Sequence, residues 1–271
     1  MDFPEEALAI WLPYRRVKEN STLRLWCFHW FGASASAYGT WEWRLGEEVE
    51  LCAIQLPGRE NRKGESGFRS IKEAATSIVG SLRGLFEEKR YAFFGHSSGS
   101  WLAYEVALML RDEGLPPPLI FFASNFPSPS TPRPLRPWKV SDEIEEKEIQ
   151  QEVQSWGLPD ILVKGHLWTA FRPLILDDFA MFEHYQIDEG VQPLGCPVAA
   201  YISQDDPKVG PKTGNPELME SWAQISSQRF MSVDVFFGNH FYLQDSAIHK
   251  AVAKAVAERV HQIADLLDFE I

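Results

Sequence analysis

Residues 91–105 read Y-A-F-F-G-H-S-S-G-S-W-L-A-Y-E, an apolar run that is broken by two glycines and then continues at helical spacing. This order predicts a buried strand, a sharp turn and a helix. Gly95, Ser97 and Gly99 form the pattern G-x-S-x-G, in which a serine occupies a strained turn and the glycines let neighbouring backbone pack closely. Ser97 is therefore the candidate nucleophile. A glycine-rich turn without chemistry is the alternative until a base and an acid are found.

Apolar runs separated by helical patterns extend this arrangement in both directions along the chain. Further strands are expected at 23–30, 49–56, 119–123, 198–203 and 233–237, and amphipathic helices at 71–86 and 246–267. Alternating strands and helices predict an α/β fold with a mostly parallel, doubly wound sheet that is covered on both faces. We expect one domain over residues 1–271.

Loop and helical patterns interrupt this alternation between residues 123 and 198. Prolines punctuate 127–137, the stretch from Ser141 and Asp142 to Glu145 predicts the start of a helix, and Pro173 is expected to separate two helices. In a doubly wound sheet such an insertion lies over the carboxyl ends of the strands, where ligands bind, so a lid is expected at about 127–190. The alternative is a helical excursion that only covers the sheet.

Composition narrows the possible partners and compartments. The net charge is −12, from 26 Lys and Arg against 38 Asp and Glu, which argues against binding to nucleic acid or to an anionic membrane. Cys27, Cys52 and Cys196 lie in or beside apolar runs and show no metal-ligand spacing, as expected for buried thiols in a reducing compartment. The N-terminus is acidic and no apolar stretch has the length of a membrane span, so we expect a cytoplasmic protein.

A serine nucleophile needs a base, and seven histidines are available. His240 directly follows the last predicted strand and is the favoured base, because its loop would return it to the carboxyl edge of the sheet. His29, at the end of the first strand, is interpreted as a packing or gating residue, and His96 as structural support beside the nucleophile. The remaining histidines lie on helical segments and are expected to be solvated or satisfied locally: His166, His184, His249 and His261.

The acid that orients the base should lie between the serine and the histidine, at the end of a strand. Asp205 and Asp206 follow the apolar run at 198–203, and a solvated turn is the alternative reading of the pair. The chain order Ser, Asp, His matches that of the α/β-hydrolases. Asp206 is favoured over Asp205 because its surroundings, D-P-x-V, resemble the acid turn of that superfamily.

Longer motifs narrow the resemblance to one family. The stretch C-F-H-W-F-G-A-S-A-S-A-Y from Cys27 resembles the C-F-P-Y-A-G-G-S-A-S-x-F of type II thioesterases, the editing enzymes of polyketide and nonribosomal peptide synthesis. It is similar too to the medium-chain thioesterases of fatty acid synthases. Q-L-P-G-R-E-N-R, G-H-S-S-G, D-D-F-A-M-F-E-H-Y, P-L-G-C-P-V and G-N-H-F-Y-L continue the likeness from about residue 23 to residue 243.

This resemblance implies a serine thioesterase that works through an acyl-enzyme without metal or organic cofactor. Ser97 would be the nucleophile, His240 the base and Asp206 its orienting acid, and the backbone N–H groups of Ser98 and Phe31 would form the oxyanion hole. Four departures bear on substrate range, one of which is Leu176 in place of the arginine that often precedes the family's Ala-Asp-Phe in the lid. The family's proline is His29 here, its Ala-Gly-Gly is Phe31-Gly32-Ala33, and its methionine beside the nucleophile is Ser98.

The resemblance also implies a partner, an acyl or peptidyl carrier protein bearing acyl-phosphopantetheine. Because both proteins are acidic, docking needs a local basic patch, for which Arg133, Arg136 and Lys139, or the group after the second strand at 59–63, are candidates. Aromatic residues of the insertion are candidates for lining an acyl pocket, with only a minority expected to face substrate: Trp138, Trp168, Phe171, Phe179 and Phe182. The alternatives are a carboxylesterase, an acyl-CoA hydrolase or a ligand-binding protein without turnover.

Overall fold

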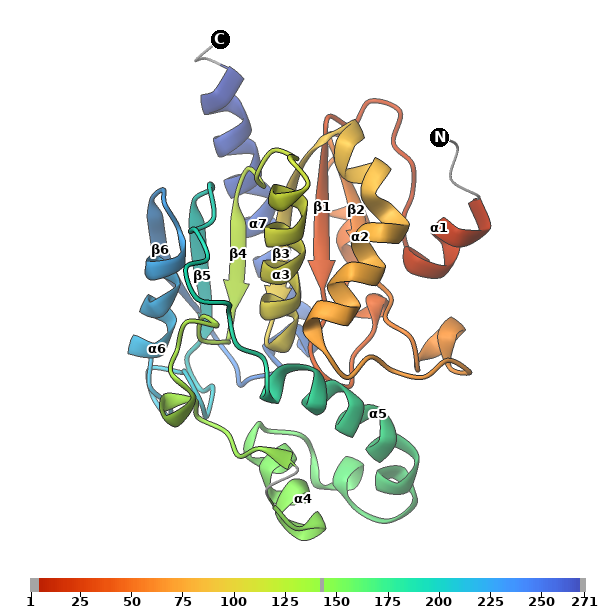
Figure 1. The fold of residues 1–271 in the computed structure, drawn as a ribbon, viewed down its shortest axis with the longest axis vertical. Coiled ribbons are helices and arrows are strands. Elements are labelled where there is room, and N and C mark those ends of the chain that lie inside the picture. The colour runs from red at the N-terminus through yellow and green to blue at the C-terminus, as the bar shows by residue number, and fades with distance from the viewer. Residues whose placement is uncertain (1–4, 142–143, 269–271) are drawn as a thin grey trace.

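The computed structural model describes residues 5–141 and 144–268 and contains one six-stranded parallel sheet (Figure 1). The strand order is β2-β1-β3-β4-β5-β6, and every neighbouring pair is parallel, which confirms the predicted doubly wound α/β sheet. The strands are β1 (Leu23–Phe28), β2 (Val49–Ala53), β3 (Arg90–His96), β4 (Phe121–Ser124), β5 (Val198–Ser203) and β6 (Phe230–Phe236).

The helices occupy the connections between these strands. The α-helices are α1 (Glu5–Trp11), α2 (Ile71–Glu88), α3 (Ser98–Asp112), α4 (Glu146–Ser155), α5 (Gly165–Glu183), α6 (Glu217–Glu220) and α7 (Ser246–Asp268). Short 3₁₀ helices complete the chain: η1 (Ala35–Trp43), η2 (Glu60–Arg62), η3 (Arg133–Leu135), η5 (Asp160–Val163), η6 (Ser221–Ile225) and η7 (Tyr242–Gln244).

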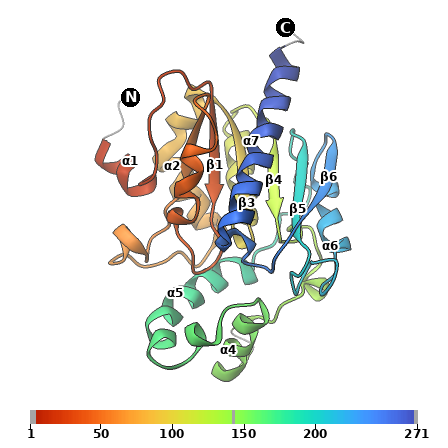
Figure 2. The same cartoon turned by 180° about the vertical axis from the view of Figure 1, so that it is seen from behind.

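The helices cover both faces of the sheet, and the insertion covers one end. Helices α2 and α3 lie in front of the sheet in Figure 1, and α7 crosses its other face in Figure 2. Helices α4 and α5, between β4 and β5, lie beyond the carboxyl ends of the strands. The insertion therefore occupies the end of the sheet where α/β proteins bind ligands.

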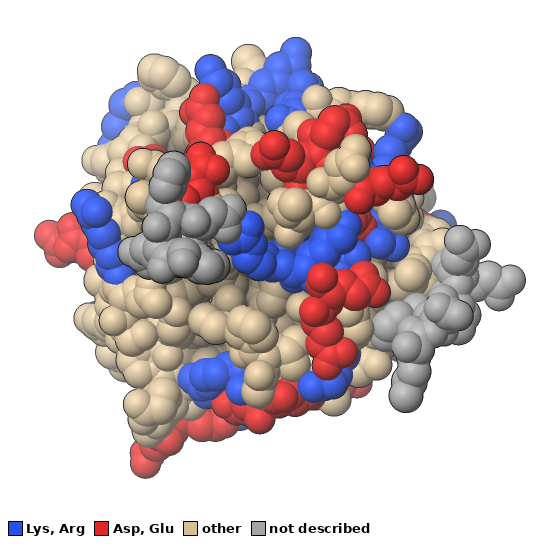
Figure 3. All heavy atoms as spheres, turned by 90° about the horizontal axis from the view of Figure 1, so that it is seen from above, with Lys and Arg blue, Asp and Glu red and all other residues tan. Residues whose placement is uncertain are grey.

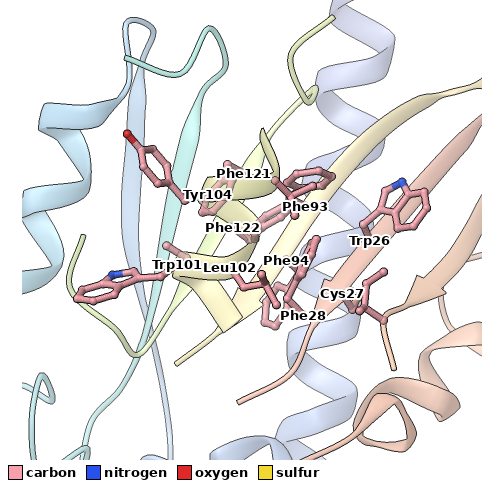
Figure 4. Packing of buried hydrophobic residues seen from close by; sticks show 14 of the residues in the cluster. Trp26, Cys27, Phe28, Phe93, Phe94, Trp101, Leu102, Tyr104, Phe121 and Phe122 are labelled. Atoms are coloured by element: carbon pink, nitrogen blue, oxygen red, sulfur yellow. The ribbon is translucent and has the colours of Figure 1, made fainter. Parts of the chain in front are cut away.

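The core is built from aromatic side chains that neighbouring strands bring into register. Phe93 and Phe94 of β3 pair with Phe121 and Phe122 of β4, and Figure 4 shows all four side chains within the cluster of buried hydrophobic residues. All four are fully buried, as is Trp26 of β1, whose ring stacks on Phe86 at 3.9 Å between centroids. Strands buried on both faces explain why the sequence shows continuous apolar runs instead of alternation.

Helix α3 packs against β1 through backbone alone at one point. A Cβ atom added at Gly99 would lie 2.3 Å from the carbonyl oxygen of Phe28 and 2.6 Å from that of His29. At Gly95 the added atom would lie 2.4 Å from Cα of Ser100. The two glycines of the G-x-S-x-G pattern are thus required by close backbone approach.

The structure corrects one prediction about the insertion. Pro173 does not separate two helices but lies inside α5. Proline removes one intrahelical N–H donor, yet α5 buries a row of side chains that includes Ile175 and Phe179, and this packing outweighs the local loss. The predicted helix start at Ser141 includes Asp142, which lies outside the described residues, and α4 begins at Glu146.

Figure 3 shows the end of the molecule that lies opposite helices α4 and α5. This end carries Lys and Arg interspersed with Asp and Glu. Mixed charge of this kind is typical of a solvated surface. Within residues 5–141 and 144–268, none of the helices combines the length and the apolar character that crossing a bilayer requires.

Alanine substitutions at two helical glycines should have opposite effects on stability. Gly99→Ala should lower the free energy of unfolding by at least about 3 kcal/mol, because the methyl group cannot coexist with the β1 carbonyls. Gly80→Ala, at an exposed position of α2 with nothing within 4 Å, should raise it by about 0.5–1 kcal/mol. Urea unfolding measures both, and a stable Gly99→Ala protein would contradict this packing.

Candidate active site

Ser97 occupies the turn between β3 and α3 in a strained conformation. Its φ is 52° and its ψ is −133°, a combination that residues with a Cβ rarely adopt. Its N–H donates to the carbonyl oxygen of Ser124 at the end of β4, 2.8 Å away. The turn thereby presents the Ser97 hydroxyl beyond the carboxyl edge of the sheet.

The structure brings together the three residues that the sequence singled out. Oγ of Ser97 lies 2.9 Å from Nε2 of His240, and Nδ1 of His240 lies 2.7 Å from Oδ2 of Asp206. All three residues are fully buried. Asp205 lies in a different environment, with a carboxylate oxygen 3.2 Å from Nζ of Lys212. Between the two aspartates, the geometry places Asp206 beside the histidine.

The Asp206 carboxylate is fixed by its own turn. Its Oδ1 accepts hydrogen bonds from the backbone N–H groups of Lys208 at 2.7 Å and Val209 at 3.0 Å. Oδ2 is thereby left to face His240. Because a carboxylate can only accept, Nδ1 of His240 carries the proton and Nε2 is free to accept the Ser97 hydroxyl proton.

His96 holds the backbone of the histidine loop. Its Nε2 lies 2.9 Å from the carbonyl oxygen of His240, and its Nδ1 lies 2.8 Å from Oγ of Ser124, which in turn lies 2.7 Å from the hydroxyl of Tyr242. Since a carbonyl only accepts, Nε2 of His96 is the donor. Burial and the neighbouring His240 keep the pKa of His96 well below its usual value, so the ring stays neutral. His96 therefore has the supporting position expected of it.

Three aromatic rings surround the His240 imidazole. The ring centroid of Trp156 lies 4.7 Å from that of His240, Phe241 lies at 5.0 Å edge-on, and Phe31 stacks at 6.4 Å. Apolar rings exclude water and lower the local dielectric constant, so the polar interactions of the three site residues are stronger than they would be in water.

Lys208 connects the acid turn to helix α4. Its Nζ lies 2.8 Å from Oε1 of Glu152, and the same oxygen accepts from the indole N–H of Trp156 at 3.0 Å. The ammonium also lies 4.9 Å from the Trp156 ring centroid. Both charged side chains are largely buried. We call Lys208, Glu152 and Trp156 the α4 latch, because they attach the insertion to the turn that carries Asp206.

A cavity of about 220 Å³ adjoins the aromatic shell. Phe31 and Phe241 belong both to its wall and to the shell around His240. The rest of the wall is mostly apolar: Trp30, Gly32, Leu158, Pro159, Leu162, Phe171, Ile175 and Gln244. A larger, more open groove of about 630 Å³ between α2 and α5 includes none of the three site residues or these rings.

Of the five aromatic candidates in the insertion, only Phe171 lines this cavity. Trp168, Phe179 and Phe182 are buried, and Trp138 stacks on Phe126 with centroids 4.8 Å apart. Leu158, Leu162 and Ile175 escaped prediction because an aliphatic residue that faces a cavity has the same helical spacing as one that faces the core. Phe241 carried a usable signal, since it directly follows His240.

The structure revises the basic residues considered for docking. Arg136 is 9% exposed, and its guanidinium donates to the carbonyl oxygens of Thr131 and Tyr185 and lies 4.5 Å from the Trp101 ring centroid. It is therefore a structural residue, because these buried carbonyls and the ring attract the cation inward. Lys139 is exposed and pairs with Glu148, and docking through it and Arg133 stays a prediction.

In the alternative basic group after β2, Arg59 and Arg62 are buried, whereas Lys63 is exposed. Arg59 forms an ion pair with Asp178, and Arg62 pairs with Glu65 and lies 4.2 Å from the Trp11 ring centroid. These contacts leave neither arginine available as an exposed docking residue.

The backbone groups predicted to bind an oxyanion lie on the two segments that flank Ser97. Ser98 is the first residue of α3, so its N–H is among those that have no partner within the helix. Phe31 lies in the loop after β1, and its ring contacts His240. The positive end of the α3 dipole also favours negative charge at this point.

Known proteins resemble this chain in sequence and in fold. A thioesterase domain model matches residues 23–263. The gramicidin S biosynthesis protein GrsT of Aneurinibacillus migulanus is 28% identical over 87% of this chain and 89% of its own. The medium-chain S-acyl fatty acid synthase thioesterase of Rattus norvegicus is 30% identical over 83% and 82%. The solved structure of BorB, a type II thioesterase from the borrelidin biosynthetic cluster, is 27% identical with a TM-score of 0.77, covering 93% of this chain and 98% of that one.

Replacing His29 with asparagine should reduce the amount by which the free energy of unfolding falls as the pH is lowered. Burial and the neighbouring Arg59 lower the pKa of His29 from 6.5 to about 3 in the folded protein. Between these values the unfolded chain binds a proton that the folded protein excludes. The stability contributed by neutral His29 is therefore complete above about pH 6.5 and is lost as the pH falls toward 3, by about 1.4 kcal/mol per pH unit.

Urea unfolding of both proteins between about pH 4 and pH 7 measures this difference. Asparagine can still donate to the Trp30 carbonyl, which lies 3.0 Å from Nδ1 of His29, so the loop should keep its conformation. If the free energy of unfolding changed with pH equally in the two proteins, the assignment of His29 as a buried neutral residue would be contradicted.

Proposed function

The chain belongs to the thioesterase family, with an α/β-hydrolase fold and hydrolytic activity on thioesters, and from this premise we propose that Ser97, His240 and Asp206 carry out the reaction. The observation that supports this assignment is the pair of contacts at 2.9 Å and 2.7 Å that joins the three side chains in a buried site. A hydroxyl, an imidazole and a carboxylate in this order form the arrangement that activates a serine nucleophile.

In the proposed mechanism His240 accepts the Ser97 proton as Oγ attacks the thioester carbonyl carbon. Asp206 holds His240 in the required tautomer and stabilises the imidazolium. The N–H groups of Ser98 and Phe31 stabilise the oxyanion, at about 3 kcal/mol per donor. The C–S bond breaks with proton transfer from His240 to the thiolate, water then attacks the acyl-serine with His240 as base, and the free acid leaves.

We propose that the cavity beside Phe31 and Phe241 receives the acyl chain. At about 220 Å³ it is smaller than the roughly 300–1,000 Å³ typical of sites for drug-sized ligands, so a short acyl chain is the expected substrate. Ser97 and His240 are fully buried, and Phe31 belongs to the wall between the imidazole and the cavity. Substrate entry therefore requires displacement of Phe31 or movement of the insertion.

The relatives suggest where the thioester comes from. GrsT is named for gramicidin S biosynthesis, and BorB is a type II thioesterase of the borrelidin cluster. We propose that this enzyme removes or releases acyl chains from the phosphopantetheine arm of an acyl or peptidyl carrier protein. A cytoplasmic location accords with three buried cysteines that are all free thiols.

Substitutions of the three residues test the proposed mechanism. Ser97→Ala and His240→Ala should each lower kcat by at least about 10³-fold while leaving thermal unfolding close to wild type, because the three residues act as a unit. Asp206→Asn should lower kcat far more than the matched control Asp205→Asn. Hydrolysis of acetyl-pantetheine, with an oxygen ester of the same acyl group as comparison, measures these effects. A loss of only a few-fold in Ser97→Ala would reject the mechanism.

Filling the cavity tests the acyl pocket. Leu162→Trp should lower kcat/KM for an octanoyl thioester at least about 10-fold and spare an acetyl thioester, because the indole would occupy space that only the longer chain needs. Ile161→Trp is the matched control, since Ile161 is 69% exposed and does not line the cavity. Equal losses on both substrates would place the acyl chain elsewhere.

A further inference from the structure

We propose that Arg59 and Asp178 are positioning residues for the oxyanion hole, a role that rests on the proposed function of Ser97 and of the Phe31 N–H. Arg59 follows β2 and Asp178 lies on α5, and both contact the loop after β1 that carries Phe31. We call this pair the loop clamp.

The loop clamp binds two consecutive residues of the loop. The Arg59 guanidinium donates to both oxygens of the Asp178 carboxylate, at 2.6 Å and 2.9 Å. The same carboxylate accepts from the N–H of Gly32 at 2.7 Å, and Nη1 of Arg59 donates to the carbonyl oxygen of Ala33 at 2.8 Å. Both charged side chains are almost completely buried, so these hydrogen bonds form away from competing water.

These bonds select the conformation of a tight turn at residues 30–33. The N–H of Ala33 donates to the carbonyl oxygen of Trp30 at 3.1 Å, and Gly32, the third residue of the turn, has a φ of 70°. A positive φ at this position is typical of a type II turn, in which the central peptide is flipped relative to type I. The N–H of that central peptide, on Gly32, is the group that Asp178 accepts.

This tight turn sets the direction in which the Phe31 N–H points. This N–H shares a planar trans peptide with the carbonyl group of Trp30, so the two point in opposite directions. The Trp30 oxygen is held by the Ala33 N–H and by Nδ1 of His29 at 3.0 Å. Because Arg59 holds Ala33 and Asp178 holds Gly32, the loop clamp fixes the peptide that supplies the oxyanion donor.

Stability alone gives little reason to bury this ion pair. Removing two charges from water costs about as much as their attraction returns, and apolar replacements of buried pairs are often neutral or stabilising. A bidentate arginine and a carboxylate with one further donor instead provide fixed geometry. Oxyanion stabilisation depends on such geometry, since a displacement of about 1 Å can cost roughly 100-fold in rate.

The test uses Asp178→Asn and Arg59→Lys in the full chain. With acetyl-pantetheine, each variant should show kcat lowered by about 10- to 100-fold and KM changed by less than about twofold. A trifluoromethyl ketone carrying the same acyl group forms a serine adduct whose negatively charged oxygen occupies the oxyanion hole. Its inhibition constant should therefore rise by the same factor as kcat/KM falls.

Glu50→Gln is the matched control. Glu50 is a fully buried carboxylate of β2 in an ion-pair cluster with Arg15, Arg24 and Lys89, away from the Ser97 site. Its neutralisation makes the same charge change as Asp178→Asn. It should lower the thermal midpoint and leave kcat and the ketone inhibition constant unchanged per active site.

The outcomes separate the clamp from the mechanism on which it rests. If Ser97→Ala still hydrolyses thioester, the proposed mechanism fails. If Ser97→Ala is inactive and folded Asp178→Asn keeps wild-type kcat, or loses kcat without weaker ketone binding, the clamp proposal alone is overturned. If Asp178→Asn does not fold, Arg59→Lys decides by the same two measurements, because lysine keeps the positive charge and cannot make the bidentate contact.

Discussion

At Ser97 the backbone holds a conformation that costs on the order of 1–3 kcal/mol and persists only where the surroundings over-determine it. Those surroundings are the sheet and helix α3. Gly95 and Gly99 let the helix backbone approach β3 and β1 more closely than any side chain would permit, and the Ser124 carbonyl binds the Ser97 N–H. The aromatic core beneath, with Phe93 and Phe94 in register with their β4 partners, makes this arrangement rigid. A well-packed parallel sheet is thus what keeps the strained turn in place.

Hydrogen bonds from buried polar side chains hold the backbone around His240. His96 and Asn125 both bind the carbonyl oxygen of His240, and Asn125 also exchanges hydrogen bonds with Ser203 at the end of β5. The imidazole is therefore located by its backbone as well as by Asp206. Buried polar networks of this kind specify one geometry, because any member left unpaired in a low dielectric is costly. The surrounding rings strengthen these interactions by excluding water.

Much of this arrangement could be predicted from the sequence, for identifiable reasons. Strands buried on both faces give short apolar runs, and for the five strands that were predicted with bounds both ends lie within three residues of the observed ones. Ser97, Asp206 and His240 each stand directly after such a run, so topology brings them to one edge. The burial of Arg136 could not be predicted, because it depends on carbonyl groups at residues 131 and 185 that only the folded chain brings together. The continuation of α5 through Pro173 likewise depends on tertiary packing.

The α4 latch has a consequence for how the insertion can move. The attraction between Lys208 and Glu152 was gained at the cost of their hydration, and that hydration is recovered when both side chains reach water together. The ion pair itself consequently contributes little to the free energy that opposes movement of α4. Deleting one partner leaves the other charge buried and alone, at a penalty of about 3–5 kcal/mol. The ion pair thus does little to oppose movement of the insertion, whereas substitution of either residue alone is costly. The two positions are therefore expected to change during evolution only as a pair.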